Sequence, residues 1–260
     1  MVDSARAGGL MRGMRMITAL ACLLVSYVEA PAMVGGAEPA PDAIGRSVVV
    51  IVGSHGNSCT GVALARDLVL TAAHCVLPGA DYKIVEFDAA RRPLLRDIAS
   101  IKTHPTFDPK KHRAGADVAL LKLSIPLARV APATLGPAGI AVALGDSFLV
   151  AGTGVAINGD GKSGGTARAA TLVTTGKPGT LQIRLFDPAT QGESAGLGAC
   201  NGDSGAPVFR IAPNPVIIGV VSWSTGPRNS AGCGGLTGVT PLTLYLEWIR
   251  GTAKILGNQL

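Results

Sequence analysis

The chain has 260 residues, of which 47% are hydrophobic and 15% are charged. This composition excludes an intrinsically disordered chain, because disorder requires low hydrophobicity and high net charge. The formal net charge is +6, but no run of Lys or Arg is long enough for a nucleic-acid-binding patch. We therefore expect a solvated basic surface and no nucleic-acid partner.

Residues 1–32 are predicted to form a secretory signal peptide. Basic residues precede the apolar run Met16–Val28, which is too short to span a bilayer because a spanning helix needs about 20 residues. We place the cleavage after Ala32 rather than after Ala30, where Pro31 would follow the cut bond and hinder the peptidase. The remaining chain is expected to be exported, to the periplasm or out of the cell, without stable membrane insertion.

The cysteine pattern agrees with an oxidising compartment. Four cysteines remain after the predicted cleavage: Cys59, Cys75, Cys200 and Cys233. They allow two disulfides in three connectivities, of which the simplest joins nearest neighbours in the sequence. No Cys-x-x-Cys or His-x-x-x-His spacing occurs, so we expect no zinc site.

Short β-prone runs separated by Gly, Pro, Asn and Asp follow one another along the exported part of the chain. This pattern predicts an all-β sandwich or barrel. Apolar residues at helical spacing after Pro241 predict a C-terminal helix over about residues 242–256. The stretch Ala128–Gly145 is rich in Pro, Ala and Gly and is expected to connect two halves. The β-prone runs are Ser47–Val52, Leu68–Thr71, Tyr82–Phe87, Asp117–Leu123, Ser147–Ala151, Ala170–Thr175, Thr180–Phe186 and Pro215–Ser222.

The run Asn158–Ser163 (NGDGKS) has the ending of a phosphate-binding loop, but the pattern does not continue. Ala156 stands where the phosphate loop requires Gly, and no acidic residue opens a calcium loop at the right spacing. We interpret this segment as a surface hairpin loop.

Three local patterns carry side chains that are able to do chemistry. His74 lies in the run TAAHC, Asp117 begins the run DVALLKL, and Ser204 lies in the run GDSGAP. Each pattern alone also fits a core histidine, the start of a strand or a turn. Together, in this order on a β-rich chain with a predicted signal peptide, they resemble the trypsin-like (chymotrypsin-fold) serine protease family. The resemblance covers nearly all of Met33–Leu260.

The resemblance implies an all-β fold of two six-stranded antiparallel β-barrels with a C-terminal α-helix. The N-terminal barrel is expected over about residues 33–130 and the C-terminal barrel over about residues 145–240. The cleft between the barrels is expected to hold His74 and Asp117 from the first barrel and Ser204 from the second.

The resemblance also assigns a catalytic role to each of these residues. A serine hydroxyl attacks well only beside a base, and the base needs an orienting carboxylate. His74 is expected to be the base, Asp117 the orienting carboxylate and Ser204 the nucleophile. The backbone N–H groups of Gly202 and Ser204 are expected to form the oxyanion hole.

Asp203 is expected to pair with a free N-terminal ammonium at Met33. The run Met33–Gly36 is similar to the Ile-Val-Gly-Gly start of the mature enzymes in the family. Ala32 precedes it, where precursors in the family usually carry Arg or Lys, so we expect signal peptidase to create this N-terminus directly. The resemblance further implies the disulfides Cys59–Cys75 and Cys200–Cys233.

A substrate pocket without charge is predicted. Gly198 lies at the position where enzymes that select Lys or Arg carry Asp, and no acidic residue occurs between Glu193 and Asp203. We therefore expect uncharged, mostly apolar side chains at the primary position of the substrate. Ser222 is also expected to bond the triad aspartate, and residues 222–224 to pair with the substrate backbone as an added strand. The residues expected to bind substrate are Gly198, Ala199, Ser222, Trp223, Ser224 and Gly238.

We therefore expect a secreted serine endopeptidase that acts on proteins and peptides as a monomer, needs no cofactor or metal, and is open to protein inhibitors. Two alternatives remain: a homologue without activity that binds a partner, and an esterase on the same scaffold. The presence of all three triad residues argues against the first alternative. Ester and amide substrates tested side by side would separate the second.

Overall fold

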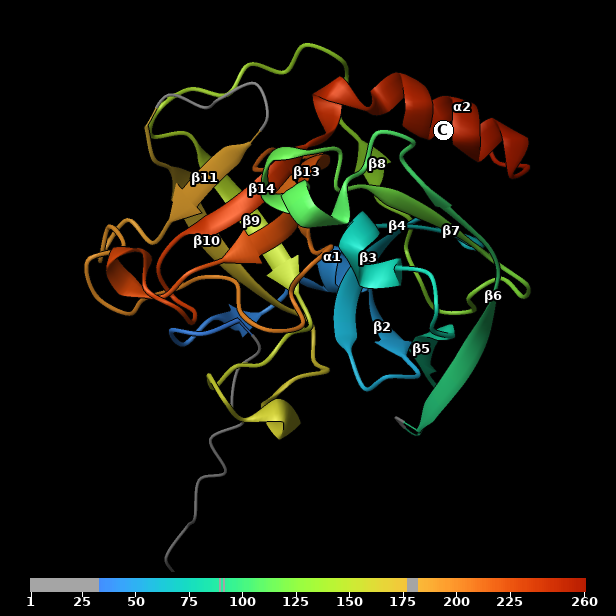
Figure 1. The fold of residues 1–260 in the computed structure, drawn as a ribbon, viewed down its shortest axis with the longest axis horizontal. Helices are drawn as coiled ribbons and strands as arrows, with labels where there is room; N and C mark the ends of the chain where they lie inside the picture. The colour runs from blue at the N-terminus through green and yellow to red at the C-terminus, as the bar shows by residue number, and fades with distance from the viewer. Residues whose placement is uncertain (1–32, 89, 91, 177–181) are drawn as a thin grey trace, which may run out of the picture.

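The computed structural model describes residues 33–88, 90, 92–176 and 182–260, so the predicted signal peptide lies outside the described residues. Two closed barrels, each of six antiparallel strands, lie side by side, and a C-terminal helix lies beside the first barrel (Figure 1). This arrangement confirms the predicted all-β fold of two six-stranded antiparallel barrels with a C-terminal α-helix.

The first barrel closes in the strand order β2-β3-β4-β7-β6-β5. β4 has the sequence LVLT and is buried at every position, as expected for a strand that is covered on both faces. β6 pairs with β5 through its first half and with β7 through its second half, so it forms a corner of the barrel. The strands are β2 (Val48–Gly53), β3 (Ser58–Ala65), β4 (Leu68–Thr71), β5 (Tyr82–Phe87), β6 (Pro93–Thr103) and β7 (Ala119–Leu123).

The second barrel closes because β9 pairs with both β10 and β12. Residues 33–39, which the sequence analysis counts with the first barrel, lie instead with the second. β1 pairs with β10, and the Met33 side chain is fully buried in the interior of the second barrel. The six strands of this barrel are β9 (Ser147–Gly152), β10 (Arg168–Thr174), β11 (Ile183–Phe186), β12 (Pro207–Arg210), β13 (Val216–Ser224) and β14 (Thr237–Pro241). Outside the ring, the two-residue strands β1 (Glu38–Pro39) and β8 (Thr134–Leu135) pair with β10 and, in parallel, with β13.

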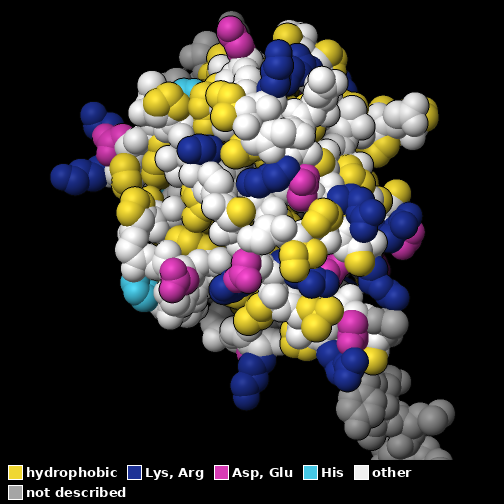
Figure 2. Space-filling view, turned by 90° about the vertical axis from the view of Figure 1, so that its right-hand side faces the viewer, with side chains coloured by type: hydrophobic (Ala, Val, Ile, Leu, Met, Phe, Trp, Pro, Cys, Tyr) yellow, Lys and Arg dark blue, Asp and Glu magenta, His cyan; other side chains and the backbone are white. Residues whose placement is uncertain are grey.

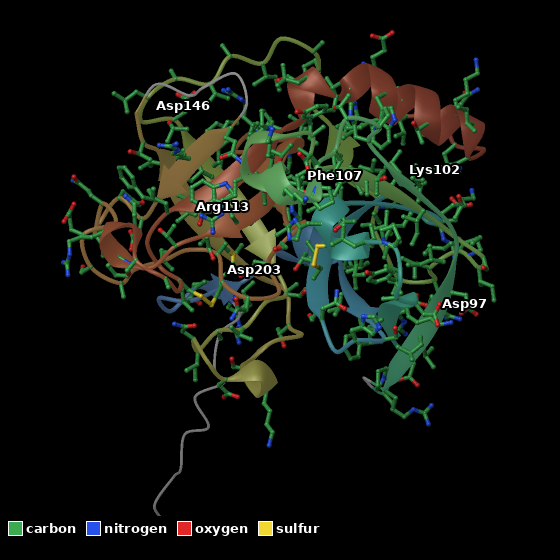
Figure 3. The ribbon with its side chains drawn as sticks, viewed as in Figure 1. Asp97, Lys102, Phe107, Arg113, Asp146 and Asp203 are labelled. Atoms are coloured by element: carbon green, nitrogen blue, oxygen red, sulfur yellow. A yellow bond between two sulfur atoms is a disulfide. The ribbon has the colours of Figure 1, made fainter. Side chains whose placement is uncertain are left out.

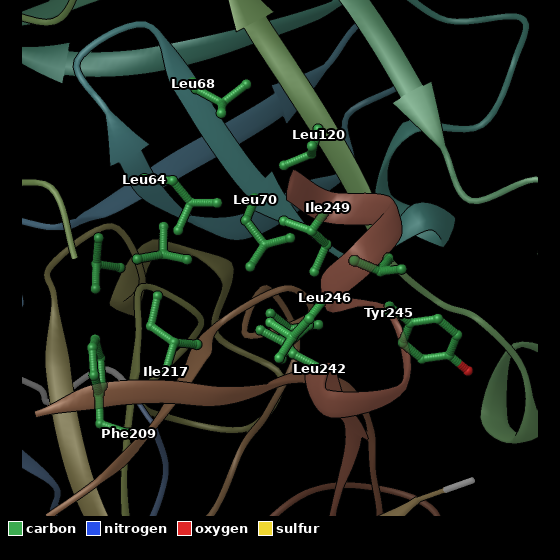
Figure 4. Packing of buried hydrophobic residues seen from close by; sticks show 14 of the residues in the cluster. Leu64, Leu68, Leu70, Leu120, Phe209, Ile217, Leu242, Tyr245, Leu246 and Ile249 are labelled. Carbon is green, nitrogen blue, oxygen red and sulfur yellow. The ribbon is translucent and has the colours of Figure 1, made fainter. Parts of the chain in front are cut away.

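A shared apolar core joins the two barrels to the C-terminal helix (Figure 4). Leu70 comes from the first barrel, Ile217 from the second, and Leu246 and Ile249 from the helix. Full burial of such a side chain contributes about 1.5–3 kcal/mol, so this core fixes the barrels relative to each other. The helix predicted over 242–256 begins as a 3₁₀ turn. The helices and turns are α1 (Asp42–Gly45), η1 (Ala73–Val76), η2 (Pro109–Ala114), η3 (Gly161–Ser163), η4 (Pro227–Asn229), η5 (Leu242–Leu244) and α2 (Leu246–Ile255).

The strands β3, β6, β12 and β14 lie where no β-prone run was identified in the sequence. β3 has the sequence SCTGVALA, whose small residues have weak intrinsic β propensity, and it is buried by its pairing with β2 and β4. β6 is exposed at most positions and therefore lacks the alternation of a half-buried strand. The strand predicted from Asp117 begins only at Ala119, because the Asp117 side chain turns towards His74.

The two predicted loop segments have little regular structure. Residues 128–145 connect the barrels and contain the two-residue strand β8. Asn158–Ser163 connects the antiparallel pair β9 and β10, so it is a hairpin loop as interpreted from the sequence. Its last turn, η3, is capped by the Asp160 side chain, which accepts the Lys162 N–H.

Basic and acidic side chains are interspersed over the face shown in Figure 2, with hydrophobic side chains between them. The formal charge of +6 is therefore not gathered into one block on this face. In the described part of the chain, no helix has the length and apolar character needed to cross a membrane.

Candidate active site

His74 and Asp117 are brought together by two turns of the first barrel. His74 lies in η1, directly after β4, and Asp117 lies just before β7, the strand that pairs with β4. The Asp117 carboxylate accepts the His74 backbone N–H at 2.9 Å and approaches the ring Nδ1 at 2.7 Å. Since one carboxylate bonds both backbone and ring, the direction of the imidazole is fixed relative to its own main chain.

A third donor reaches the same carboxylate from the second barrel. The Ser222 hydroxyl donates to Asp117 Oδ2 at 2.5 Å. The Asp117 side chain is fully buried, and a buried charge is tolerated when it is hydrogen-bonded on all sides. Because the carboxylate only accepts, the His74 proton lies on Nδ1, which leaves Nε2 as the basic nitrogen. The pKa of nearby Tyr245 is raised by burial and by the negative charge of Asp117.

Ser204 lies in a turn of the second barrel and lines the same cleft as His74. The cleft holds about 800 Å³ and is also lined by Ser222 and Trp223. The Ser204 carbonyl accepts the backbone N–H of Thr60, a residue of β3 in the first barrel. The turn that carries Ser204 is thus bonded directly to the opposite barrel.

Gly202, two residues before Ser204, has a backbone that only glycine adopts easily. Its φ is +92°, and a Cβ at this position would lie 2.9 Å from Cα of Gly154. A side chain here would therefore be both strained and in collision. Gly202 and Ser204 both line the cleft.

Asp203, between Gly202 and Ser204, points away from solvent and is fully buried (Figure 3). Its carboxylate accepts the N–H groups of Gly154 at 2.8 Å and Cys200 at 2.9 Å. Within the described part of the chain it has no cationic partner, and burial raises its pKa from 3.8 to about 7 despite these two hydrogen bonds. Met33, its expected partner, is buried in the same barrel with a φ of +56°.

The predicted substrate-binding residues divide into two groups. Ser222, Trp223 and Ser224 line the cleft, whereas Gly198, Ala199 and Gly238 do not. Ala199 is buried and donates its N–H to Thr237 Oγ1 at 3.0 Å. The Trp223 indole lies against Gly238, where a Cβ would approach the ring to 2.0 Å. The ring therefore fills the space beside Gly238.

The cleft contains one arginine that the sequence analysis did not identify. The guanidinium of Arg113 (labelled in Figure 3) lies 5.4 Å from the centre of the Trp223 ring. Arg113 lines the cleft together with His74 and Ser204. Trp223 is itself held by Gln182, which accepts its indole N–H at 2.9 Å. Since Arg113 comes from η2, nothing in its local sequence indicates that it reaches β13.

The four cysteines pair as Cys59–Cys75 and Cys200–Cys233, as the resemblance implies. The first bridge joins β3 to η1 and so holds the turn that carries His74. Cys59, His74 and Cys75 come close enough together to suggest a metal site. Both sulfurs are oxidised in the disulfide and His74 Nδ1 is bonded to Asp117, so this cluster offers no thiolate ligand.

Known proteins are similar to this chain over most of its length. The sequence model of the family described as Trypsin matches residues 33–249. Trypsin of Sus scrofa is 29% identical over 238 residues, which cover 85% of this chain and 95% of that protein. Kallikrein-15 of Homo sapiens is 26% identical over 224 residues, which cover 76% and 82%. A solved mutant of human heparin binding protein has the same fold, with a TM-score of 0.66 at 23% identity, covering 84% of this chain and 95% of its own.

Proposed function

Since this chain belongs to the trypsin family, we propose that it is a secreted serine endopeptidase that cleaves peptide bonds through an acyl-enzyme on Ser204. The observation that carries the proposal is the bonding of Asp117. Its carboxylate holds His74 by both backbone and ring, at 2.9 and 2.7 Å, on the wall of the cleft that Ser204 also lines. An oriented base beside a serine is the arrangement that nucleophilic acyl transfer requires.

The proposed reaction follows from which His74 nitrogen carries the proton. With Nδ1–H donated to Asp117, Nε2 accepts the Ser204 proton while Oγ bonds the substrate carbonyl carbon. His74 then gives this proton to the amine nitrogen as the peptide bond breaks, which leaves the acyl group on Ser204. A water molecule attacks the ester with the same base, releases the acid and restores the hydroxyl. Asp117 stabilises the imidazolium in both steps.

The developing negative charge on the carbonyl oxygen needs preorganised donors. We assign them to the backbone N–H groups of Gly202 and Ser204, because both residues line the cleft and Gly202 has the unusual φ of +92°. Loss of one such donor typically costs about 10²–10³ in rate.

Asp203 supports a processed N-terminus at Met33. A buried carboxylate without a cation is costly, and an ammonium group on Met33 would supply the missing charge inside the same barrel. We therefore propose that signal peptidase cuts after Ala32. Mass spectrometry of the secreted protein tests this, and a main species that starts elsewhere would contradict it.

The proposed primary preference is for small, uncharged side chains. The cleft wall carries hydroxyl and amide groups and no carboxylate among its described residues, so Lys and Arg would find no partner there. The Trp223 ring lies against Gly238, and we propose that it limits the room for a long side chain. Faster cleavage after arginine than after alanine or leucine would contradict this preference.

The deciding experiment is labelling of the secreted protein with a fluorophosphonate, followed by hydrolysis of matched amide and ester substrates. We expect one adduct, its loss in Ser204→Ala, and turnover of the amide. Failure to label a chain that starts at Met33 would favour a binding homologue without activity. Turnover of the ester alone would favour an esterase.

A further inference from the structure

Thr60 connects the first barrel to the turn that carries Ser204. It is fully buried in β3, and two of its donors reach the second barrel. Its backbone N–H donates to the Ser204 carbonyl at 2.8 Å, and its hydroxyl donates to the Gly202 carbonyl at 2.7 Å. Thr60 therefore bonds the main chain on both sides of Asp203.

The Thr60 hydroxyl uses its full hydrogen-bonding capacity. It accepts the Thr153 backbone N–H at 3.0 Å and lies 2.9 Å from the Thr153 hydroxyl. A hydroxyl has one proton and two lone pairs. Since the Thr60 proton goes to Gly202, the Thr153 hydroxyl must be the donor to Thr60. With one bond donated and two accepted, the direction of the Thr60 hydroxyl is determined.

The anchor itself is rigid. The Thr60 carbonyl accepts the Thr71 hydroxyl at 2.7 Å, and Thr60 is paired with Val50 in the barrel. Gly202, the residue that Thr60 holds, is flexible by comparison. It has no side chain to pack, and its backbone is in the left-handed region. A flexible residue whose N–H must point at one place needs an external restraint.

We infer that Thr60 is a positioning residue for the oxyanion hole: its hydroxyl fixes the Gly202–Asp203 peptide and so keeps the Gly202 and Ser204 N–H groups directed into the cleft. The inference rests on the proposed function. It also has a consequence for processing. The bonds from Thr60 to Gly202 and Ser204 involve no atom of Met33, so they can hold the turn before a free ammonium group forms there.

The first test compares Thr60→Val, Thr60→Ser and the control Thr174→Val. Val keeps the branched shape but removes the hydroxyl. Thr174 is also buried and donates its hydroxyl to a backbone carbonyl, that of Ala143, in a part of β10 that does not line the cleft. We expect Thr60→Val to lower kcat for an amide substrate about tenfold with KM nearly unchanged. Thr60→Ser should restore most of kcat, and Thr174→Val should leave it unchanged.

Two results would overturn the inference. The first is a kcat for Thr60→Val that is no lower than the kcat of Thr174→Val. The second is a failure of Thr60→Ser to restore kcat, because the shape of the side chain rather than its hydroxyl would then matter. If Thr60→Val does not fold, Thr60→Ala is used in its place against the same control. Absence of fluorophosphonate labelling in the unaltered protein would instead defeat the proposed function, and this inference with it.

The second test uses a form that keeps residues upstream of Met33 attached. We expect this form to react with the fluorophosphonate more slowly than the processed form but measurably. In the attached form, Thr60→Val should lower the labelling rate by a larger factor than in the processed form, because no ammonium group then helps to hold the turn. If Thr60→Val lowers the labelling rate by the same factor in both forms, Thr60 does not hold the turn more strongly in the unprocessed chain, which would contradict this part of the inference.

Discussion

Ser222 of the second barrel donates a 2.5 Å hydrogen bond to the buried carboxylate of Asp117 in the first. Together with the Thr60 bonds to Gly202 and Ser204, it ties the proposed base and the proposed nucleophile into one network across the barrel junction. The relative position of His74 and Ser204 therefore depends on polar contacts between the barrels as well as on the shared apolar core.

Ser222→Ala is expected to lower kcat about tenfold. The change removes one of three donors to a buried charge, and a hydrogen bond to a charged group contributes about 1.5–3 kcal/mol. Some of this loss will appear as lower stability, so the free energy of unfolding is measured beside kcat. Ser147→Ala, at an exposed position of β9, is the control. Wild-type kcat in Ser222→Ala would contradict the role given to this bond.

Gly202→Ala is expected to lower kcat at least a hundredfold while the protein still folds. The added methyl group meets Gly154 Cα at 2.9 Å, and a φ of +92° is unfavourable for Ala, so the turn must move. Gly161→Ala is the matched control, because its Cβ meets nothing within 4 Å and its φ is not positive. Equal activities in the two variants would show that the Gly202 conformation is not needed.

The stability of the unprocessed chain is expected to fall as the pH rises from about 4 to about 7. In the folded state burial raises the Asp203 pKa from 3.8 to about 7, so in this range the folded state binds a proton that the unfolded state has lost. The contribution of Asp203 to the free energy of unfolding is thus fully present below its pKa in the unfolded state. It is lost as the pH rises through its pKa in the folded state, and the loss amounts to about a few kcal/mol. Urea unfolding at several pH values measures it.

Two controls isolate Asp203 in that experiment. Asp203→Asn should remove this part of the pH dependence, because the amide does not titrate. A chain that starts at Met33 should also lack it, because the ammonium group stabilises the carboxylate and lowers the pKa of Asp203 again. An unprocessed chain that is equally stable at pH 4 and pH 7 would argue against the raised pKa.

Arg113 is expected to favour substrates with an acidic side chain at positions close to the cleaved bond. It has no ion pair within the described part of the chain, and the cleft lining described there contains no carboxylate to compensate it. Peptides that differ only in Glu or Gln at these positions should differ about two- to fivefold in kcat/KM at low salt, and less at high salt. Arg113→Gln should abolish the difference, whereas Arg250→Gln, on the exposed face of α2, should keep it. A preference that survives Arg113→Gln would refute this role.

The sequence predicted those parts of the site that lie within short local runs. His74, Asp117 and Ser204 each belong to a motif that can be read without knowing the fold. The alternation of β-prone runs and turn residues predicted an all-β sandwich or barrel, and the resemblance carried by these motifs implied two barrels. Gly198, Ala199 and Gly238 were identified by position alone, and they do not line the cleft. At Gly238 the Trp223 ring occupies the adjoining space, which no local run of sequence indicates.

Thr60 and Arg113 could not be predicted in this way. Thr60 bonds Thr153 and Gly202, which are 93 and 142 residues away in the sequence. In the sequence, Thr60 lies between Cys59 and Gly61 in a short run of small side chains. This run contains no motif that indicates a role for Thr60. Arg113 acquires its place in the cleft from the packing of η2 against β13. In both cases the information lies in the pairing of distant segments, which local patterns do not contain.

The placement of the proposed machinery on two barrels has a consequence for when activity can begin. Neither barrel alone holds both His74 and Ser204, so hydrolysis can begin only after both have closed and docked onto each other. An unfolded or half-folded chain is thus expected to lack the proposed activity. Completion of folding would in this sense start the proposed activity.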